Sequence, residues 1–291
     1  MWLVLGGDGQ LGRCLDEVLL AANIPHRCAN RSTVDITDAS AVGGIVADLS
    51  PAVIVNAAAW TAVDDAEDHE SDALRINGGG AGNVARAARD CGARLIHIST
   101  DYVFNGRATS PYRIDSETAP VGAYGRTKLV GEQEVDKAGL DRWHVVRTAW
   151  LYSRHGRNFA KTMAIRALRG EAVSVVDDQR GQPTSALDLA RMLVALHRAD
   201  APSGIVHGTN GGEATWYEFA RAIYECADAD TSLVGATNSG AYVTKAVRPA
   251  YSVLDHSGFA DLGISPMRHW RDALADAWPA ISDRVREESA T

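Results

Sequence analysis

The sequence is poor in the features that mark secreted, membrane-spanning and nucleic-acid-binding proteins. Its four cysteines lie far apart without a C-x-x-C pair, which is typical of reduced thiols and not of a disulfide framework. No apolar run reaches about 18 residues, and the apolar start, residues 1–5, meets two glycines without a basic leader. The net charge is −8 and there is no basic run. The sequence therefore predicts a cytoplasmic protein with no membrane and no nucleic-acid partner.

The nine histidines show no H-E-x-x-H or other metal-ligand spacing, so no required metal is expected. An acidic run, residues 64–70, could suggest a cation site. Such a run near a helix start is more often a solvated face that the helix dipole favours, and we adopt that interpretation.

What the sequence does contain is a regular alternation of short apolar runs with helical patterns. Strands are predicted at 2–5, 53–57, 95–99, 143–151, 173–176 and 205–208, with a weaker one at 26–29. Helices are predicted near 9–22, 39–49, 71–90, 122–137, 157–169, 184–199 and 215–228. Several strands are apolar throughout, as in a parallel sheet covered on both faces. This order predicts an α/β fold, a Rossmann-type doubly wound parallel sheet.

The alternation of strand and helix patterns becomes less regular after residue 150, which predicts a smaller C-terminal substrate-binding lobe. We expect a dinucleotide-binding Rossmann domain over residues 1–150, with a return segment at about 184–210. The lobe would take residues 151–183 and 211–291. The last ten residues, 282–291, are polar and are expected to be frayed.

A glycine-rich loop follows the first predicted strand and opens a helix. It satisfies G-x-G-x-x-G through Gly7, Gly9 and Gly12, and G-x-x-G-x-x-G through Gly6, Gly9 and Gly12. Either spacing suits a tight turn with a pyrophosphate on the helix amides, whereas the alternative is a tight turn that binds nothing. No acid ends the second strand, and Arg31 there could take a ribose 2′-phosphate or be a solvated cation. NADPH is therefore favoured over NADH.

Tyr124 and Lys128 lie four residues apart on a predicted helix, so they share one helical face. Alone, such a pair is more often a solvated surface. Here a dinucleotide loop lies upstream and Ser99 and Thr100 end the fourth strand, which favours catalysis. In that interpretation Tyr124 donates a proton to a carbonyl oxygen that Thr100 polarises. Lys128, together with the positively charged nicotinamide of the oxidised complex, lowers the pKa of the tyrosine, and Lys128 also holds the cofactor ribose.

These residues resemble the extended short-chain dehydrogenase/reductases, and among them the dTDP-4-dehydrorhamnose reductases. The matching segments are GGDGQLG (6–12), VDITD (34–38), NAAAWTAVDDAE (56–67), STDYVFNG (99–106), AYGRTKLVGE (123–132), RTAWLYS (147–153), NFAKTM (158–163), DDQRGQPT (177–184), TWYEFA (215–220) and RPAYSVLD (248–255). The resemblance implies NAD(P)H-dependent reduction of the 4-keto group of dTDP-6-deoxy-L-lyxo-4-hexulose to dTDP-L-rhamnose.

The resemblance also implies residue roles. The catalytic residues would be Thr100, Tyr124 and Lys128. The cofactor would contact Gly6, Gly9, Gln10, Leu11, Gly12, Arg31, Asp35, Ile36, Ala59, Trp60, Thr61 and Ser99, together with Tyr124 and Lys128. The nucleotide sugar would contact Thr100, Asp101, Phe104, Trp150, Gln182 and Arg248. Trp150 could stack on the deoxysugar or be a core residue at a domain seam, and Arg248 could bind the diphosphate or form a lid-closing salt bridge.

Several alternatives stay open. Some members of the family pair through magnesium held by glutamates, but Cys14 stands where one of these would fall, so a monomer or weak homodimer is expected. A 4,6-dehydratase is disfavoured because Tyr102, and not a glutamate, follows Asp101. A reductase of a related 4-keto sugar keeps the same three catalytic residues. A non-catalytic NADP-binding regulatory subunit would not need them.

Overall fold

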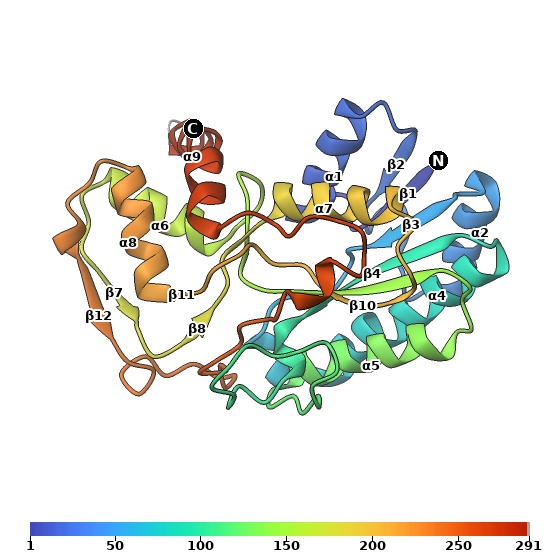
Figure 1. The fold of residues 1–291 in the computed structure, drawn as a ribbon, viewed down its shortest axis with the longest axis horizontal. Helices are drawn as coiled ribbons and strands as arrows, with labels where there is room; N and C mark the ends of the chain where they lie inside the picture. Colours follow the sequence, from blue (N-terminus) through green and yellow to red (C-terminus); the bar gives the residue numbers. More distant parts are fainter. Residues whose placement is uncertain (290–291) are drawn as a thin grey trace.

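Residues 1–289, which the computed structural model describes, are organised around a six-stranded parallel sheet (Figure 1). In spatial order its strands are β10 (Gly204–His207), β5 (Trp143–Thr148), β4 (Arg94–Thr100), β3 (Val53–Asn56), β1 (Trp2–Leu5) and β2 (His26–Ala29). β1 and β3 are buried along their whole length, as a strand covered on both faces must be. The predicted α/β class is confirmed.

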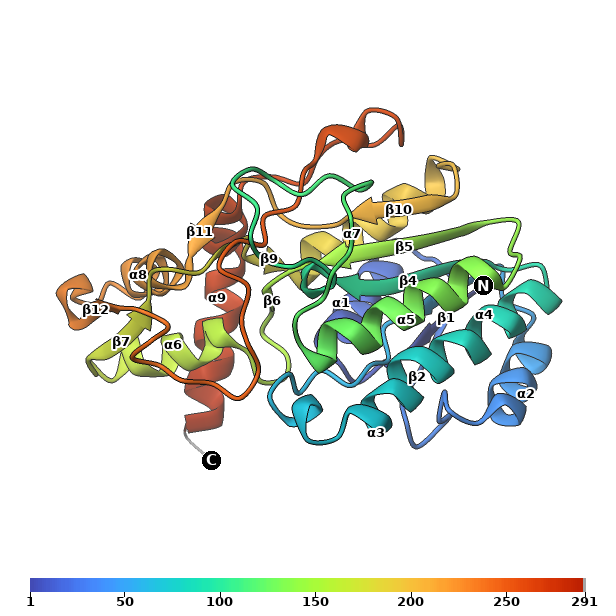
Figure 2. The same cartoon turned by 90° about the horizontal axis from the view of Figure 1, so that it is seen from below.

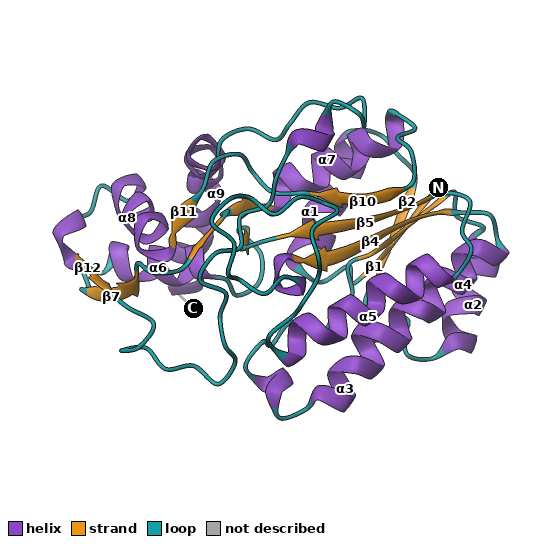
Figure 3. Cartoon of the chain, turned by 60° about the horizontal axis from the view of Figure 1, so that its bottom comes forward, coloured by secondary structure: helices purple, strands orange, loops and turns teal. Residues whose placement is uncertain are grey.

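Helices cover both faces of this sheet (Figure 3). One face carries α1 (Gln10–Ala21) and α7 (Ala186–Arg198), and the other carries α2 (Ala39–Leu49), α4 (Ala81–Asp90) and α5 (Ala123–Lys137). α4 and α5 lie side by side (Figure 2). Each layer has its own buried apolar cluster, so the sheet is packed from both sides. No helix of the described chain combines the length and apolar character that crossing a bilayer requires.

The helix predicted over 71–90 is interrupted. It consists of α3 (Glu70–Leu74), a π-helical segment over Arg75–Gly80, and α4. The segment turns Asn77 inward. Asn77 Oδ1 accepts the Trp60 amide at 2.8 Å, and Asn77 Nδ2 donates to Thr127 Oγ1 at 3.0 Å. The π-helical segment therefore ties the loop after β3 to α5.

Most of the remaining elements pack around a third apolar cluster, in a region that we call the small lobe: α6 (Phe159–Leu168), β7 (Val173–Val176), α8 (Trp216–Cys226), β12 (Val234–Thr237) and α9 (Trp270–Ser289). Its strand pairing is short. β7 pairs with β12 in parallel, and β8 (Arg180–Gly181) pairs with β11 (Ala214–Thr215) in antiparallel fashion. β6 (Leu151–Tyr152) and β9 (Thr184–Ser185) pair at the junction with the sheet. The predicted domain bounds remain a proposal.

The prediction that residues 282–291 are frayed is wrong as far as the structure describes them. α9 runs to Ser289, and residues 290 and 291 lie outside the described part. Leu274, Ile281 and Val285 recur at helical spacing and are buried in the small-lobe core. The many charged residues around them hid this spacing from the sequence analysis.

Candidate active site

A cleft of about 870 Å³ runs along the carboxyl edge of the sheet and reaches the small lobe. Its nucleotide end is lined by the predicted cofactor residues Gly6, Gly9, Gln10, Leu11, Gly12, Arg31, Asp35, Ile36, Ala59 and Thr61. Its other end is lined by the predicted residues Ser99, Thr100, Asp101, Tyr124, Lys128, Trp150 and Arg248. The two sets lie far apart in the sequence, so the fold brings the predicted cofactor and catalytic residues to one cleft.

The glycine loop has the shape that a bound pyrophosphate requires. Gly6 has φ +83°, and a Cβ there would lie 2.7 Å from the Ala58 amide nitrogen. A Cβ on Gly12 would collide with the Gly6 carbonyl oxygen. α1 begins after Gly9 without a side-chain cap, so its first amides are available to an anion. The loop therefore fits a dinucleotide.

The adenosine end of the cleft combines a cation with an ordered carboxylate. Arg31 lies 3.5 Å from Asp35, and its side chain is still 76% exposed. Hydrogen bonds from Thr37 hold the pKa of Asp35 below its ordinary value. Sequence analysis missed Asp8 and Asn30, which also line this end and are joined by a 2.6 Å hydrogen bond.

α5 presents its functional side chains at four-residue spacing. Tyr124, Lys128 and Glu132 follow one another on the face that meets the sheet. Lys128 is buried, and its ammonium donates to the Ile98 carbonyl at 2.7 Å. Burial lowers the pKa of Lys128 to about 8, although Glu132 acts in the opposite direction.

In the protein alone, the phenol of Tyr124 does not have a lowered pKa. Burial raises its pKa to about 12, against the opposing effect of a hydrogen bond with Thr100. The negative charge of Asp101 also raises it. Tyr124 is thus protonated near neutral pH, which suits a proton donor.

Glu132 is a positioning residue that sequence analysis missed. It accepts two hydrogen bonds from the Arg147 guanidinium on β5, at 3.0 and 2.7 Å, and one from Ser99 on β4. Glu132 and Arg147 are both buried. This network fixes α5, and with it Tyr124 and Lys128, over the ends of two strands. The continued four-residue spacing after Lys128 was the signal that could have revealed it.

The floor of the cleft holds two oxygen atoms without partners. Asp101 Oδ2 and Thr148 Oγ1 are buried and have no hydrogen-bond partner within residues 1–289. Burial raises the pKa of Asp101 to about 6. Thr148 is the register partner of Thr100 on the neighbouring strand, and the other Asp101 oxygen, Oδ1, accepts a hydrogen bond from the Thr100 hydroxyl at 3.0 Å. Asp101 and Thr148 both line the cleft, so these atoms can meet a polar ligand there.

The small lobe contributes an aromatic wall. Trp150 adopts φ +45° and stacks on Trp216, with ring centroids 3.6 Å apart and planes 9° apart. Gly181 lets the Trp150 ring lie close, because a Cβ there would be 2.6 Å from the indole. Both indoles line the cleft. Trp150 is therefore both a seam residue and a cleft residue, and Trp216 is a wall residue that sequence analysis missed.

Arg248 lines the cleft but is already paired. Its guanidinium donates to both carboxylate oxygens of Asp64, at 3.1 and 2.6 Å. Burial raises the pKa of Asp64, but the bonds from Arg248 outweigh this and leave it below its ordinary value. The structure thus contains the salt bridge that was one of the two predicted roles of Arg248.

Three predicted residues lie outside the cleft lining. Trp60 packs beside Tyr124 in a small apolar cluster. Phe104 stacks on Tyr112 at 4.2 Å. Gln182 accepts the Leu254 amide at 2.8 Å within the protein interior. Their predicted ligand contacts stay predictions.

The sequence pattern of the family described as RmlD substrate binding domain matches residues 1–282. The chain belongs to the RmlD family. This confirms the resemblance, and it places the chain among the extended short-chain dehydrogenase/reductases. The matched residues span the sheet and most of the small lobe, so the match includes all the residues that line the cleft.

Relatives of this RmlD-family chain include enzymes with different named substrates. The chain is 46% identical over 281 residues to the dTDP-4-keto-6-deoxy-D-glucose reductase of Streptomyces niveus, covering 97% of each chain. It is 45% identical over 288 residues to the dTDP-4-dehydrorhamnose reductase of Streptomyces griseus, covering 98% of this chain and 95% of the relative. The crystal structure of the Bacillus anthracis dTDP-4-dehydrorhamnose reductase in complex with NADP superposes with a TM-score of 0.92 at 36% identity, covering 96% of this chain and 98% of that one.

Proposed function

We propose that this RmlD-family protein reduces the 4-keto group of dTDP-6-deoxy-L-lyxo-4-hexulose to give dTDP-L-rhamnose, with NADPH or NADH as the reductant. The observation that carries the proposal is one cleft that holds a dinucleotide loop at one end and Thr100, Tyr124 and Lys128 at the other. The 45% identity to the Streptomyces griseus dTDP-4-dehydrorhamnose reductase supports the sugar.

The chain's own residues supply a proton and polarise the carbonyl. A nicotinamide cofactor, when bound, would supply a hydride to the carbonyl carbon. The Thr100 hydroxyl, which donates to Asp101 Oδ1 in the structure, would turn to donate to the ketone oxygen and stabilise the charge that develops there. The Tyr124 phenol, protonated near neutral pH, would give its proton to that oxygen and complete the alcohol.

Cofactor binding would fall to the glycine loop and to the residues beside it. The free amides at the start of α1 would hold the pyrophosphate, and exposed Arg31 suits a 2′-phosphate. The NADP complex of the Bacillus anthracis relative supports NADPH. Lys128, buried beside Tyr124, would hold the nicotinamide ribose.

Sugar binding would use the unpaired oxygens and the aromatic wall. Asp101 Oδ2 can accept a hydrogen bond from a sugar hydroxyl, and Thr148 Oγ1 can donate or accept one. The stacked pair of Trp150 and Trp216 offers a flat apolar face to a deoxysugar.

A second candidate is reduction of dTDP-4-keto-6-deoxy-D-glucose, the C3 and C5 epimer. The relative from Streptomyces niveus, at 46% identity, carries that name. Both candidates use the same three catalytic residues, so only the sugar contacts would differ.

The test follows absorbance at 340 nm with each sugar and each cofactor. A sugar 4,6-dehydratase alone supplies dTDP-4-keto-6-deoxy-D-glucose, and the dehydratase with a 3,5-epimerase supplies the L-lyxo sugar. The proposal expects rapid, substrate-dependent loss of absorbance only when the epimerase is present. Equal or faster loss without epimerase would select the second candidate, and no loss with either sugar would refute both.

A further inference from the structure

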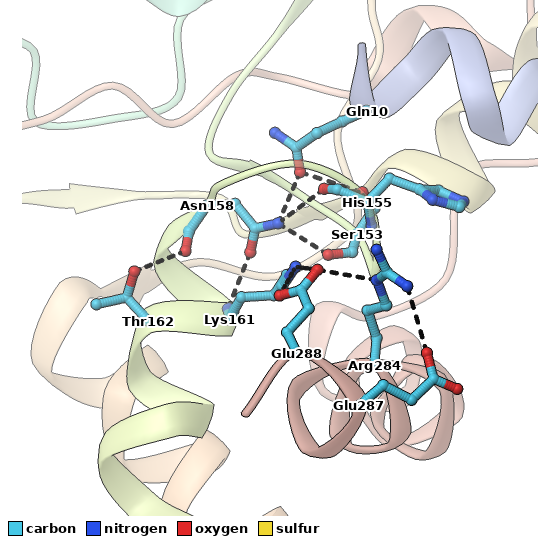
Figure 4. A network of polar contacts seen from close by, with 9 residues as sticks. All are labelled: Gln10, Ser153, His155, Asn158, Lys161, Thr162, Arg284, Glu287 and Glu288. Atoms are coloured by element: carbon cyan, nitrogen blue, oxygen red, sulfur yellow. Dashed lines mark hydrogen bonds and ion pairs between the residues drawn. The ribbon is translucent and has the colours of Figure 1, made fainter. Parts of the chain in front are cut away.

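The segment that joins β6 to α6, residues 153–158, docks on the helix that follows the glycine loop (Figure 4). It is anchored at two points on α1. Ser153 Oγ and Asn158 Nδ2 donate to Gln10 Oε1 at 3.2 and 2.9 Å. About two turns further along α1, Arg154 and His155 both contact Glu17 Oε1 at 2.6 Å. The segment that leads into the small lobe is thus anchored on α1.

Both the oxygen and the nitrogen of the Asn158 side-chain amide make hydrogen bonds. Its Oδ1 accepts the Lys161 amide at 3.0 Å and caps the start of α6. Its Nδ2 donates to Gln10 Oε1 and, at 2.8 Å, to the Ser153 carbonyl. A single side chain therefore links the starts of two helices from the two halves of the molecule. Gln10 and Asn158 both line the cleft.

α6 is also joined to α9 by an ion pair. Lys161, which is buried, pairs with Glu288 of α9 at 2.8 Å (Figure 4). Glu288 also accepts a hydrogen bond from Arg284 at 2.8 Å. Because α6 is joined to α9 in this way, a shift of Asn158 would move α6 and α9 together and not one side chain alone.

We infer that Asn158 is a positioning residue that fixes Gln10 for the cofactor pyrophosphate and so couples cofactor binding to the placement of the small lobe. The inference rests on the proposed use of a dinucleotide cofactor and not on the identity of the sugar. Gln10 lies at the first turn of α1, where a pyrophosphate would sit. Occupation of that site stabilises the Gln10 side chain in the position that Asn158 already holds, and the lobe carrying Trp216 follows.

The deciding variant is Asn158→Ser, because serine can still cap α6 but cannot reach Gln10. The matched control is Thr162→Val on the same helix, whose hydroxyl donates to the Asn158 carbonyl and not to Gln10. Binding is measured by fluorescence titration with NADPH and with adenosine 2′,5′-bisphosphate. The second probe carries the 2′-phosphate but no pyrophosphate.

Asn158→Ser is expected to weaken NADPH binding about three- to tenfold, the loss typical of one hydrogen bond, and to leave adenosine 2′,5′-bisphosphate binding unchanged. Thr162→Val is expected to leave both affinities unchanged. Unchanged NADPH affinity in Asn158→Ser, or an equal loss for both probes, would overturn the inference. Failure of the wild type to bind NADPH or NADH would overturn it together with the proposed cofactor.

Gln10→Met provides a second test of the inference, because it removes the acceptor of the Asn158 hydrogen bond and leaves the α6 cap unchanged. If Asn158 acts through Gln10, the Gln10→Met/Asn158→Ser double variant binds NADPH no more weakly than Gln10→Met alone. Fully additive losses would contradict the inference. With NADPH saturating, Asn158→Ser is expected to raise the KM for the sugar severalfold with little change in kcat. An inactive wild type would refute the proposed sugar while leaving the titrations decisive.

Discussion

The two halves of the molecule hold their parts of the cleft by different means. The predicted catalytic residues lie at the end of β4 and on α5, which packs on a continuous parallel sheet in which β4 and β5 pair over six residues. The wall of the small lobe is held by strand pairs as short as two residues and by stacked aromatic rings. The sheet side therefore depends on strand pairing and on the buried Glu132–Arg147 ion pair. The small-lobe side depends on side-chain packing, which a substitution alters more locally.

The largest effect is expected from Tyr124→Phe, on the sheet side. The change removes the proton donor and leaves the ring in place, so kcat should fall by about 10²- to 10⁴-fold. The melting temperature and the NADPH dissociation constant should stay close to those of the wild type. Stopped-flow and steady-state assays at 340 nm measure kcat. Calorimetry measures the melting temperature, and titration measures the NADPH dissociation constant. Turnover near the wild-type rate would remove Tyr124 from the mechanism.

Glu132→Gln tests the buried network of the sheet side through stability. It leaves the buried Arg147 guanidinium without its carboxylate, which should cost about 3–5 kcal/mol of unfolding free energy. The matched control is Glu134→Gln on the same helix. Its carboxylate makes only longer contacts, 3.9 Å to Arg86 and 3.4 Å to Lys137, and should change stability by less than about 1 kcal/mol. Equal effects in urea unfolding would show that burial of the pair is unimportant.

Lys128 should give activity and stability opposite pH dependences. Because its folded pKa is about 8, the ammonium loses its proton as pH rises through 8, and kcat/KM for reduction should then fall about tenfold per pH unit. The phenol of Tyr124 stays protonated over this range.

The same depressed pKa has the reverse effect on folding. Between pH 8 and the unfolded pKa of about 10.4, the unfolded chain binds the extra proton, so the contribution of Lys128 to stability rises with pH. Urea unfolding of the wild type and of Lys128→Met at pH 8 and pH 10 measures the contribution of Lys128 to the pH dependence of stability. A wild-type pH dependence identical to that of Lys128→Met would rule out a depressed lysine pKa.

On the small-lobe side, Trp216→Leu removes the ring on which Trp150 stacks. The KM for the sugar nucleotide should rise about three- to tenfold, the value of one aromatic pair, with the NADPH dissociation constant unchanged. Tyr217→Leu, at the next position of α8 and outside the cleft lining, serves as the control. A kcat loss as large as that of Tyr124→Phe would mean that the wall takes part in the chemistry.

The smallest effect is expected from Asp64→Asn, which weakens the pairing with Arg248 at the cleft rim. The pair is partly exposed, so stability should change by less than about 1 kcal/mol. If the released Arg248 then binds the sugar diphosphate, the KM for the sugar should fall slightly. An increase would show that the salt bridge itself helps to hold the substrate.

Sequence reasoning predicted the sheet side well, because its signals are local. The glycine loop, the apolar strands and the Tyr124–Lys128 spacing each lie within a few residues. It failed where contacts are distant in the chain: nothing local indicates that Trp216 meets Trp150 or that Glu132 meets Arg147. The raised pKa of Tyr124 escaped prediction for the same reason, since burial is a property of the whole fold. The helix at 270–289 was missed because its apolar spacing is sparse.

The π-helical segment at Arg75–Gly80 fixes how many residues the chain can have between α3 and α4. Each residue removed from a regular helix rotates what precedes it by about 100°. Loss of one residue here would therefore turn Asn77 away from Trp60 and Thr127, and the Thr127 hydroxyl in turn donates to the Tyr124 carbonyl. A Cβ on Gly79 would meet nothing within 4 Å. The segment should accept a different residue at position 79, but it should not accept a deletion, because the active site and not the helix determines its length.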